Sequence, residues 1–118
     1  MEKFCIELPL ENEYFTTVRL TTGGVCSLSG LDVDASEDYK VCVTESLLIL
    51  KRSGFARAKI EYSVEDGLCC RVLGVGEQSD VEESVEDGIS RALLSALVDE
   101  VAYTEDGNRV TGVTFLVK

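Results

Sequence analysis

The sequence predicts an α+β fold, a two-layer α/β sandwich in which helices cover one face of a mixed, mostly antiparallel sheet. Segments with strand and helix patterns follow one another in the order β-α-α-β-β-α-β-β. Neighbouring strands are joined as hairpins, which favours antiparallel pairing. The helical segments are amphipathic, so each has an apolar face to bury against a sheet. With 118 residues, 45% of them hydrophobic, the chain is expected to form one domain over residues 1–118.

The first part of the chain predicts a strand and a helix. Residues 3–9 alternate loosely and end at a proline, which favours a strand at the edge of the sheet. Asn12 is placed to cap a helix over about residues 13–29, which Gly30 ends. Gly23-Gly24 in its middle costs about 1 kcal/mol per glycine relative to alanine, so close packing or a bend is expected there. The apolar face consists of Tyr14, Val18, Thr21, Val25 and Leu28.

A second helix follows a short link. Asp34 and Glu37 resemble a capping box, which predicts a helix from there to about Ser53, with Gly54 as its C-terminal stop. The second half of this helix is apolar except for one carboxylate, Glu45. The buried face is expected to hold Tyr39, Cys42 or Val43, Ser46, Leu47 and Leu50.

The next segments predict a hairpin and an acidic loop. Residues 58–64 and 68–72 alternate between apolar and polar side chains, and Asp66-Gly67 between them is a strong hairpin signal. Residues 74–86 are expected to form a loop, because they are acidic and contain glycine.

A third helix and two closing strands complete the expected fold. The helix covers about residues 86–98, and the strands cover about 100–104 and 110–117 around a turn at Asp106-Gly107-Asn108. The core face of the helix is expected to consist of Ile89, Leu93, Ala96 and Leu97.

Charge and hydropathy exclude several classes of protein. The net charge is −11, from 22 acidic and 11 basic residues. Because contacts to phosphates need a basic face, this charge disfavours nucleic-acid binding. No apolar run approaches the roughly 18 residues that span a bilayer, and the first residues lack the layout of a signal peptide. A cytoplasmic protein without a membrane segment is expected.

The cysteines form neither a metal-binding nor a catalytic pattern. No pair has CxxC spacing and the chain contains no histidine, so zinc sites and Cys–His nucleophile pairs are essentially excluded, and no metal ligands are expected. The cysteines lie in apolar segments, which is typical of buried thiols in a reducing compartment. They are Cys5, Cys26, Cys42, Cys69 and Cys70.

Four segments, spread over nearly the whole chain, resemble one known family in their order and spacing. The segments are 13–21, 37–45, 97–101 and 112–114. They look like the first helix, the start of the ATP-site helix, the end of the third helix with the strand after it, and the closing strand of the GHKL ATPases. These proteins share the histidine-kinase-like, or Bergerat, fold. Within that superfamily the chain most resembles the bacterial anti-sigma factor serine kinases.

The resemblance implies a catalytic role for Glu45 that the next turn of the helix does not support. In the family this helix carries a glutamate that activates the attacking hydroxyl and, four residues on, an asparagine that holds magnesium. The spacing places both side chains on one helix face. Here Glu45 is followed by Ile49, which cannot ligate a hard cation. Glu45 is therefore interpreted as a vestigial catalytic residue, and the alternative is a surface or capping carboxylate.

The remaining nucleotide-site positions implied by the resemblance are also incomplete. The family's Asp-x-Gly-x-Gly motif corresponds to Gly74 and Gly76 without the aspartate that recognises adenine, and the alternative is simply a strand end followed by a loop. The glycine-rich turn before the third helix is reduced to Gly88, and Thr114 lies in the closing strand. The ATP lid is expected to be shortened and is acidic, which is unsuitable for a triphosphate. These four residues are the expected vestiges of a nucleotide site.

These observations lead to three hypotheses about function. The first is a regulatory protein-binding module that resembles an anti-sigma factor, without kinase activity and without a cofactor. The resemblance then implies a sigma factor or an anti-sigma antagonist as partner, contacted through Arg19, and a homodimer. The second is an active ATP-dependent serine/threonine-protein kinase that uses ATP and Mg²⁺. The third is a pocket beside Glu45 for another small molecule, which would be excluded if Ile49 and Leu73 fill the space.

Overall fold

The computed structural model describes residues 2–81, 85–107 and 109–118. The elements follow the predicted order, and the predicted fold class is confirmed. Their bounds are β1 (Phe4–Pro9), the 3₁₀ turn η1 (Asn12–Tyr14), α1 (Phe15–Leu28), α2 (Val33–Arg52), β2 (Arg57–Val64), β3 (Leu68–Val75), α3 (Glu86–Leu97), β4 (Glu100–Asp106) and β5 (Arg109–Val117). The expected loop residues Glu82 and Glu83 and the expected turn residue Asn108 lie outside the described residues.

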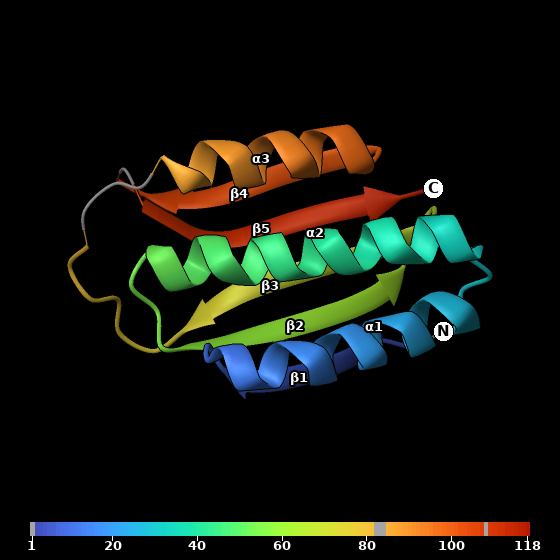
Figure 1. Ribbon diagram of the computed structural model, residues 1–118, viewed down its shortest axis with the longest axis horizontal. Helices are drawn as coiled ribbons and strands as arrows, with labels where there is room; N and C mark the ends of the chain where they lie inside the picture. The colour runs from blue at the N-terminus through green and yellow to red at the C-terminus, as the bar shows by residue number, and fades with distance from the viewer. Residues whose placement is uncertain (1, 82–84, 108) are drawn as a thin grey trace.

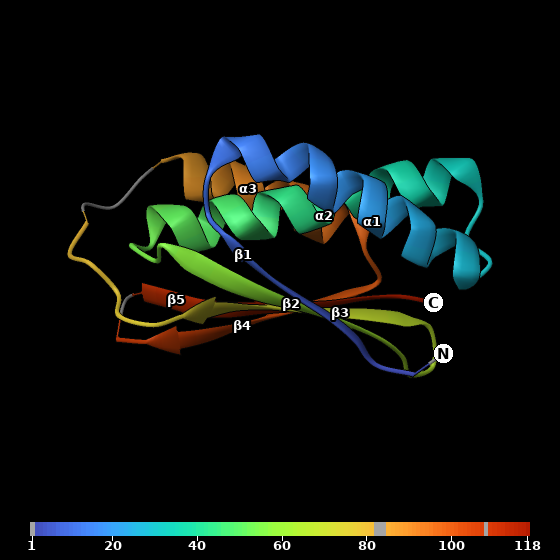
Figure 2. The same ribbon diagram turned by 90° about the horizontal axis from the view of Figure 1, so that it is seen from below.

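The five strands form one sheet in the order β1-β2-β3-β5-β4, and every pairing in it is antiparallel. The helices lie on one side of this sheet, as Figure 2 shows. We call the side away from the helices the open face. The hairpin between β2 and β3 has positive φ angles at Asp66 (55°) and Gly67 (134°), as the Asp-Gly signal predicts.

The helix α2 lies between α1 and α3 and covers the centre of the sheet (Figure 1). This position explains its composition, because it is packed by a neighbour on each side and by the sheet below. Tyr39 at its first half is fully buried, packs its ring 5.0 Å from that of Phe115, and donates a hydrogen bond to the Leu68 carbonyl oxygen (3.2 Å). The whole expected face of this helix is buried, and Thr44 and Ile49 are buried as well. No helix among the described residues is long and apolar enough to cross a membrane.

Both predicted N-terminal caps are wrong by a few residues. Asn12 lies in the 3₁₀ turn before α1, and its Oδ1 accepts a hydrogen bond from Lys51 Nζ (3.3 Å) instead of capping the helix. The cap of α2 is Asp32, whose Oδ1 accepts from the Ala35 amide (2.8 Å). Asp34 lies within the first turn, where a carboxylate complements the helix dipole.

The predicted core faces of the outer helices are rotated from the real ones. In α3 the buried residues are Ser90 and Leu94, whereas Ile89 and Leu93 are 62% and 37% exposed. In α1 the buried residues are Phe15, Val18, Thr22, Val25 and Cys26, so that Tyr14 and Leu28 are not part of the core. Periodicity locates an amphipathic helix but leaves its rotation uncertain by about one residue when apolar and small polar residues adjoin the stripe.

Candidate functional site

Glu45 lies on α2 at the side that faces α3, and its carboxylate is engaged in a hydrogen bond. Oε1 accepts from the hydroxyl of Ser90 on α3 at 3.1 Å. Ser90 is 1% exposed, and its Oγ also accepts from Arg52 Nη2 at 2.9 Å. Glu45 itself is half-buried. The Glu45 carboxylate is thus bonded to a hydroxyl of the protein itself.

Arg52 connects the last turn of α2 to the first turn of α3. Its Nη1 donates to Oδ1 of Asp87, and its Nε lies 3.8 Å from Oε2 of Glu86. An arginine at a helix C-terminus and carboxylates at a helix N-terminus both complement the helix dipoles. We call Glu45, Arg52, Asp87 and Ser90 the α2–α3 clasp. The clasp joins the two helices by a chain of hydrogen bonds among protein side chains.

Ile49, one turn after Glu45, is fully buried in the hydrophobic core. An aliphatic side chain in this position offers no oxygen to a divalent cation. The described residues hold no cluster of three or more acidic, cysteine or histidine side chains suited to a metal ion. At Ile49 the α2 face is therefore an apolar packing surface.

Gly74 lies near the end of β3 on the helix side of the sheet, paired with Ala58. A Cβ placed on Gly74 would lie 2.5 Å from the ring of Phe55, which is 7% exposed. The glycine therefore makes room for an aromatic ring of the same chain. Gly76 follows with a φ of +86°, and a Cβ there would meet nothing within 4 Å. Gly76 is exposed, whereas Gly74 is half-buried.

The segment after Gly76 folds back over the C-terminal end of α2. The Ser79 amide donates to the Gly54 carbonyl (2.9 Å), and the Ser53 carbonyl accepts from Gln78 Nε2 (2.8 Å) and Arg109 Nη2 (3.0 Å). Gly54 has a φ of +102°, and a Cβ on it would lie 2.2 Å from the Ser79 carbonyl oxygen. The start of the expected lid is thus fastened to the protein by its own hydrogen bonds.

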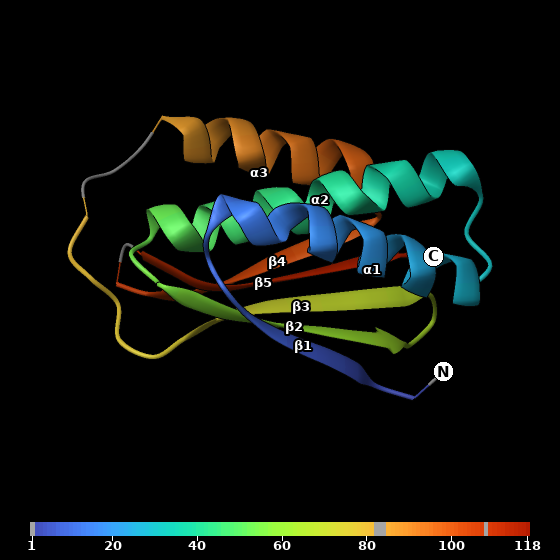
Figure 3. The same cartoon turned by 60° about the horizontal axis from the view of Figure 1, so that its bottom comes forward.

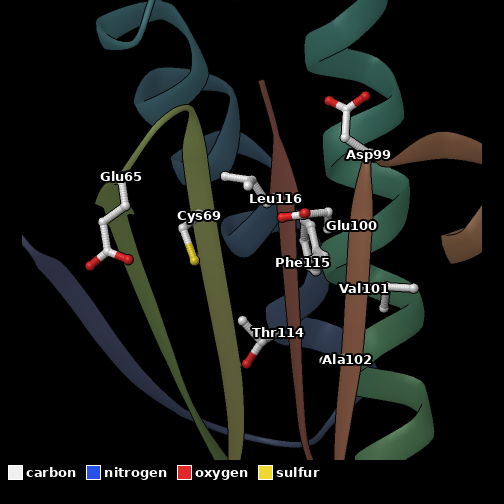
Figure 4. Close-up of a pocket in the computed structure, with 9 residues that line it drawn as sticks. All are labelled: Glu65, Cys69, Asp99, Glu100, Val101, Ala102, Thr114, Phe115 and Leu116. Carbon is white, nitrogen blue, oxygen red and sulfur yellow. The ribbon is translucent and has the colours of Figure 1, made fainter.

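The last two expected nucleotide-site residues, Gly88 and Thr114, lie on opposite sides of the sheet. Gly88 is exposed in the first turn of α3, and a Cβ there would meet nothing within 4 Å. Thr114 lies on β5 opposite Arg71 and points to the open face, away from α2. There it lines a cavity of about 680 Å³ together with Cys69 and residues of β4 (Figure 4). The structure therefore brings Glu45 close to the start of α3 but does not bring Thr114 to the same side of the sheet.

The two residues that were to exclude a pocket beside Glu45 lie on different faces of the sheet. Ile49 is buried on the helix side, whereas Leu73 lies on the open face opposite Lys59 and Gly112. Glu45 does not line the cavities at Thr114, Phe4, Gly23 and Gly30. The small-molecule pocket beside Glu45 stays a hypothesis.

Arg19 lies on the exposed side of α1, and its Nε donates to Oγ1 of Thr44 on α2 at 3.3 Å. Among the described residues no carboxylate lies within ion-pair distance of its guanidinium. The remaining donors of Arg19 are therefore available to another molecule.

Comparison with known proteins identifies relatives along nearly the whole chain. The chain is 28% identical to Serine-protein kinase RsbW of Listeria innocua serovar 6a, over an alignment of 138 positions that covers 98% of this chain and 88% of that protein. It is 26% identical to the protein of the same name from Staphylococcus epidermidis, with 96% and 86% covered. These likenesses, which extend over nearly the whole chain, support the resemblance to the anti-sigma factor serine kinases. No protein-family model matches the chain.

This chain is shorter than these relatives within the aligned region. The alignment has 138 positions, whereas the chain has 118 residues, so the relatives carry residues that have no counterpart here.

The sequence did not point to three residues that contact the expected site residues. Ser90 and Arg52 form the clasp, and Phe55 fills the space at Gly74. The local signal for Ser90 was its position immediately after Gly88-Ile89, at the start of a helix. Arg52 and Phe55 carry no such signal, because their partners lie far away in the sequence.

Proposed function

We propose that this chain is a regulatory protein-binding module of the anti-sigma type that neither binds ATP with magnesium nor phosphorylates a partner. The observation that carries the proposal is the buried Ile49 one turn after Glu45, at the place where a magnesium ligand is needed. Phosphoryl transfer relies on metal ions to neutralise charge between the β- and γ-phosphates. Without that ligand, a carboxylate beside the phosphates only adds repulsion.

Two further features support the loss of nucleotide binding. The α2–α3 clasp joins the two helices, and Phe55 occupies the space at Gly74. The expected lid is acidic at Glu77 and Asp80 and is fastened at Ser79, which is unsuitable for a triphosphate. We also propose that the residues present in the relatives and absent here belong to the lid.

Calorimetric titration tests the proposal directly. Mg-ATP and Mg-ADP injected into the chain should produce only heats of dilution up to millimolar nucleotide. The Listeria innocua relative, which is named a kinase, is the positive control under the same buffer and temperature. Micromolar binding by this chain would overturn the proposal.

The alternative function is an active serine/threonine-protein kinase. The names of the relatives favour it, and so does the retention of Glu45 at the side of α2 that faces α3. It predicts transfer of labelled phosphate from ATP to a cognate partner protein, abolished in Glu45→Ala. No labelling of a partner that binds the chain would dispose of this alternative.

We further propose that Arg19 contacts the protein partner, a sigma factor or an anti-sigma antagonist. Arg19 is exposed and has no acidic partner among the described residues, so its charge is available. Arg19→Ala should weaken capture of the partner roughly tenfold while the unfolding transition changes little. An unchanged affinity would exclude this contact.

We also propose that the chain forms a homodimer through β1 and α1. The strand β1 is at one edge of the sheet (Figure 3), and a groove of about 570 Å³ between it and α1 is lined by Phe4, Val25 and the 79% exposed Leu28. Leu28→Glu should convert a dimer into a monomer in sedimentation velocity experiments. A monomer in the unaltered chain at high micromolar concentration would refute the homodimer.

A further inference from the structure

A buried carboxylate, Glu61, lies on the open face of the sheet, where no helix covers it. It is on β2, and its side chain is only 8% exposed. Carboxylates are rarely buried unless they are paired, so the neighbours of Glu61 must supply both cover and charge. Lys3 Nζ lies 3.1 Å and Lys59 Nζ 3.4 Å from Oε1, and Arg71 Nη1 lies 3.6 Å from Oε2. Three cations therefore converge on one carboxylate.

This convergence leaves an excess of positive charge on an acidic protein. A fourth cation, Arg57, is on the same face and pairs with Glu7 at 3.2 Å. We call Lys3, Arg57, Lys59 and Arg71, with Glu7 and Glu61, the basic sheet patch. It holds four cations and two carboxylates, whereas the whole chain has a net charge of −11. The patch is therefore opposite in charge to the molecule that carries it.

The cationic groups of the patch are held in place and remain accessible. Lys3, Lys59 and Arg71 are 55%, 43% and 52% exposed. Glu61 and Arg71 are direct neighbours across β2 and β3, and Lys59 precedes Glu61 on the same face of β2. Oε2 of Glu61 is buried and has no hydrogen-bond partner among the described residues. Glu61 thus holds Lys59 and Arg71 on rigid strands, and Lys3 just before β1, without saturating their donors.

We propose that the basic sheet patch docks an acidic segment of a partner protein. Aspartate and glutamate side chains would share Lys3, Lys59 and Arg71 with Glu61, and each new pair would be charge-assisted. This inference rests on the proposed function, in which the chain acts by binding another protein, and adds a surface on the opposite side of the sheet from α1 and Arg19.

Two other occupants fit the observations less well. A second copy would have to place one of its acidic segments on the patch, which is a heterologous contact that forms open chains rather than closed dimers. A nucleic acid would extend beyond a patch of four cations onto a surface whose overall charge repels phosphates. A short acidic protein segment gains the attraction of the patch and avoids the rest of the surface.

Fluorescence anisotropy with a defined probe tests the docking site. The probe is a fluorescein-labelled ten-residue peptide of alternating glutamate and serine, and the same peptide with glutamine for glutamate is its control. The double variant Lys59→Gln/Arg71→Gln should bind the acidic peptide about three- to tenfold more weakly. Lys40→Gln/Lys51→Gln, which removes the same charge from α2, should bind as the unaltered chain does.

A second variant separates docking from a merely structural role. Glu61→Gln should bind the acidic peptide more tightly, because the three cations lose their internal counter-charge, even though the fold loses stability. Equal binding of both peptides, or equal losses in the two double variants, would overturn the inference. Displacement of the peptide by a ten-nucleotide single-stranded DNA at equal concentration would also overturn it and favour a nucleic acid.

The nucleotide titration distinguishes failure of this inference from failure of the proposed function. Binding of Mg-ATP would refute the proposed function and leave the peptide result unaffected. Failure of the acidic peptide to bind, in a chain that also binds no Mg-ATP, would refute only the docking site.

Discussion

Gly23 and Gly24 occupy adjacent positions in α1, yet a methyl group would have different surroundings at each. A Cβ on Gly23 would lie 2.9 Å from Cε of Lys40, whereas nothing lies within 4 Å of a Cβ on Gly24. The close packing suggested by the sequence is thus present at Gly23 only. Glycine in a helix interior is unfavourable because the unfolded chain gains freedom and the helix gains no contact.

We expect Gly24→Ala to raise the free energy of unfolding by about 0.5–1 kcal/mol, measured by urea denaturation. Gly23→Ala should gain less, because the end of the Lys40 side chain must move. Gly30→Ala is the control of opposite sign, since its φ of +80° is unfavourable for alanine. A loss of stability in Gly24→Ala would contradict the open surroundings of Gly24.

We expect the contribution of Glu61 to the stability of the fold to depend on pH. Burial opposes its ionisation, but the hydrogen bonds and charges of Lys3 and Lys59 outweigh burial and hold its pKa below the ordinary 4.5. A carboxylate with a lowered pKa in the folded state stabilises the protein above its unfolded pKa, and this stabilisation is lost as the pH falls through the folded pKa.

The difference in unfolding free energy between the unaltered chain and Glu61→Gln should therefore be largest above about pH 5 and should shrink as the pH falls below 4. Urea denaturation at several pH values measures it. Glu7→Gln, which removes a half-exposed carboxylate of the same patch, is the matched control for the loss of one carboxylate from this surface. A difference that stays constant from pH 6 to pH 3 would refute the linkage.

The helices show what the sequence can predict about an element. Hydrophobic periodicity was sufficient to predict the number and order of the helices, because each helix needs one apolar face to pack against the sheet. It did not identify Asp32 as the cap of α2, since two aspartates two residues apart both fit a capping pattern. Periodicity also failed to predict the buried face of α3, because a buried serine does not contribute to an apolar pattern. Ser90 is buried by its bonds to Glu45 and Arg52.

We expect the α2–α3 clasp to stabilise the contact between the two helices. Ser90→Ala removes one hydroxyl that links both Glu45 and Arg52, and we expect a loss of about 1–3 kcal/mol in unfolding free energy, because the freed groups remain partly buried. Ser95→Ala, at an exposed position of the same helix, is the matched control and should change stability by less than about 0.5 kcal/mol.

Amide hydrogen exchange adds a local readout to this comparison. Amides of α3 should lose protection in Ser90→Ala more than amides of β2, because the clasp fastens α3 to α2 and not the sheet. Equal stability of the two serine variants, with unchanged exchange in α3, would show that the clasp contributes nothing.

For the whole molecule, the sequence predicted the order of the elements and the position of Glu45 and Ile49, since both follow from local patterns. It could not predict what fills the space around them. The clasp joins residues 35 to 45 positions apart, and Phe55 reaches Gly74 across a strand pairing. Such contacts depend on how the layers pack, which one sequence does not encode in any short motif.

The reactivity of the cysteine thiols measures how readily the core opens. Cys26, Cys42 and Cys70 are fully buried, and burial raises the pKa of all three thiols, to about 12 at Cys42. Cys69 is half-buried and its pKa is raised in the same direction by burial, whereas Cys5 is exposed on β1. Because the thiolate is the reactive form, a raised pKa and exclusion of the reagent act together.

At pH 8 in excess Ellman's reagent, we expect one thiol to react rapidly, one slowly, and three only as the protein unfolds. Cys5→Ser should abolish the rapid phase and leave the other phases unchanged. The rate of the last three should rise with urea in parallel with the population of unfolded chains, because α2 and β3, which carry Cys42 and Cys70, form the centre of the core. Rapid reaction of three or more thiols in the native protein would show that the core opens locally, and would contradict the packing of α2 between its neighbours.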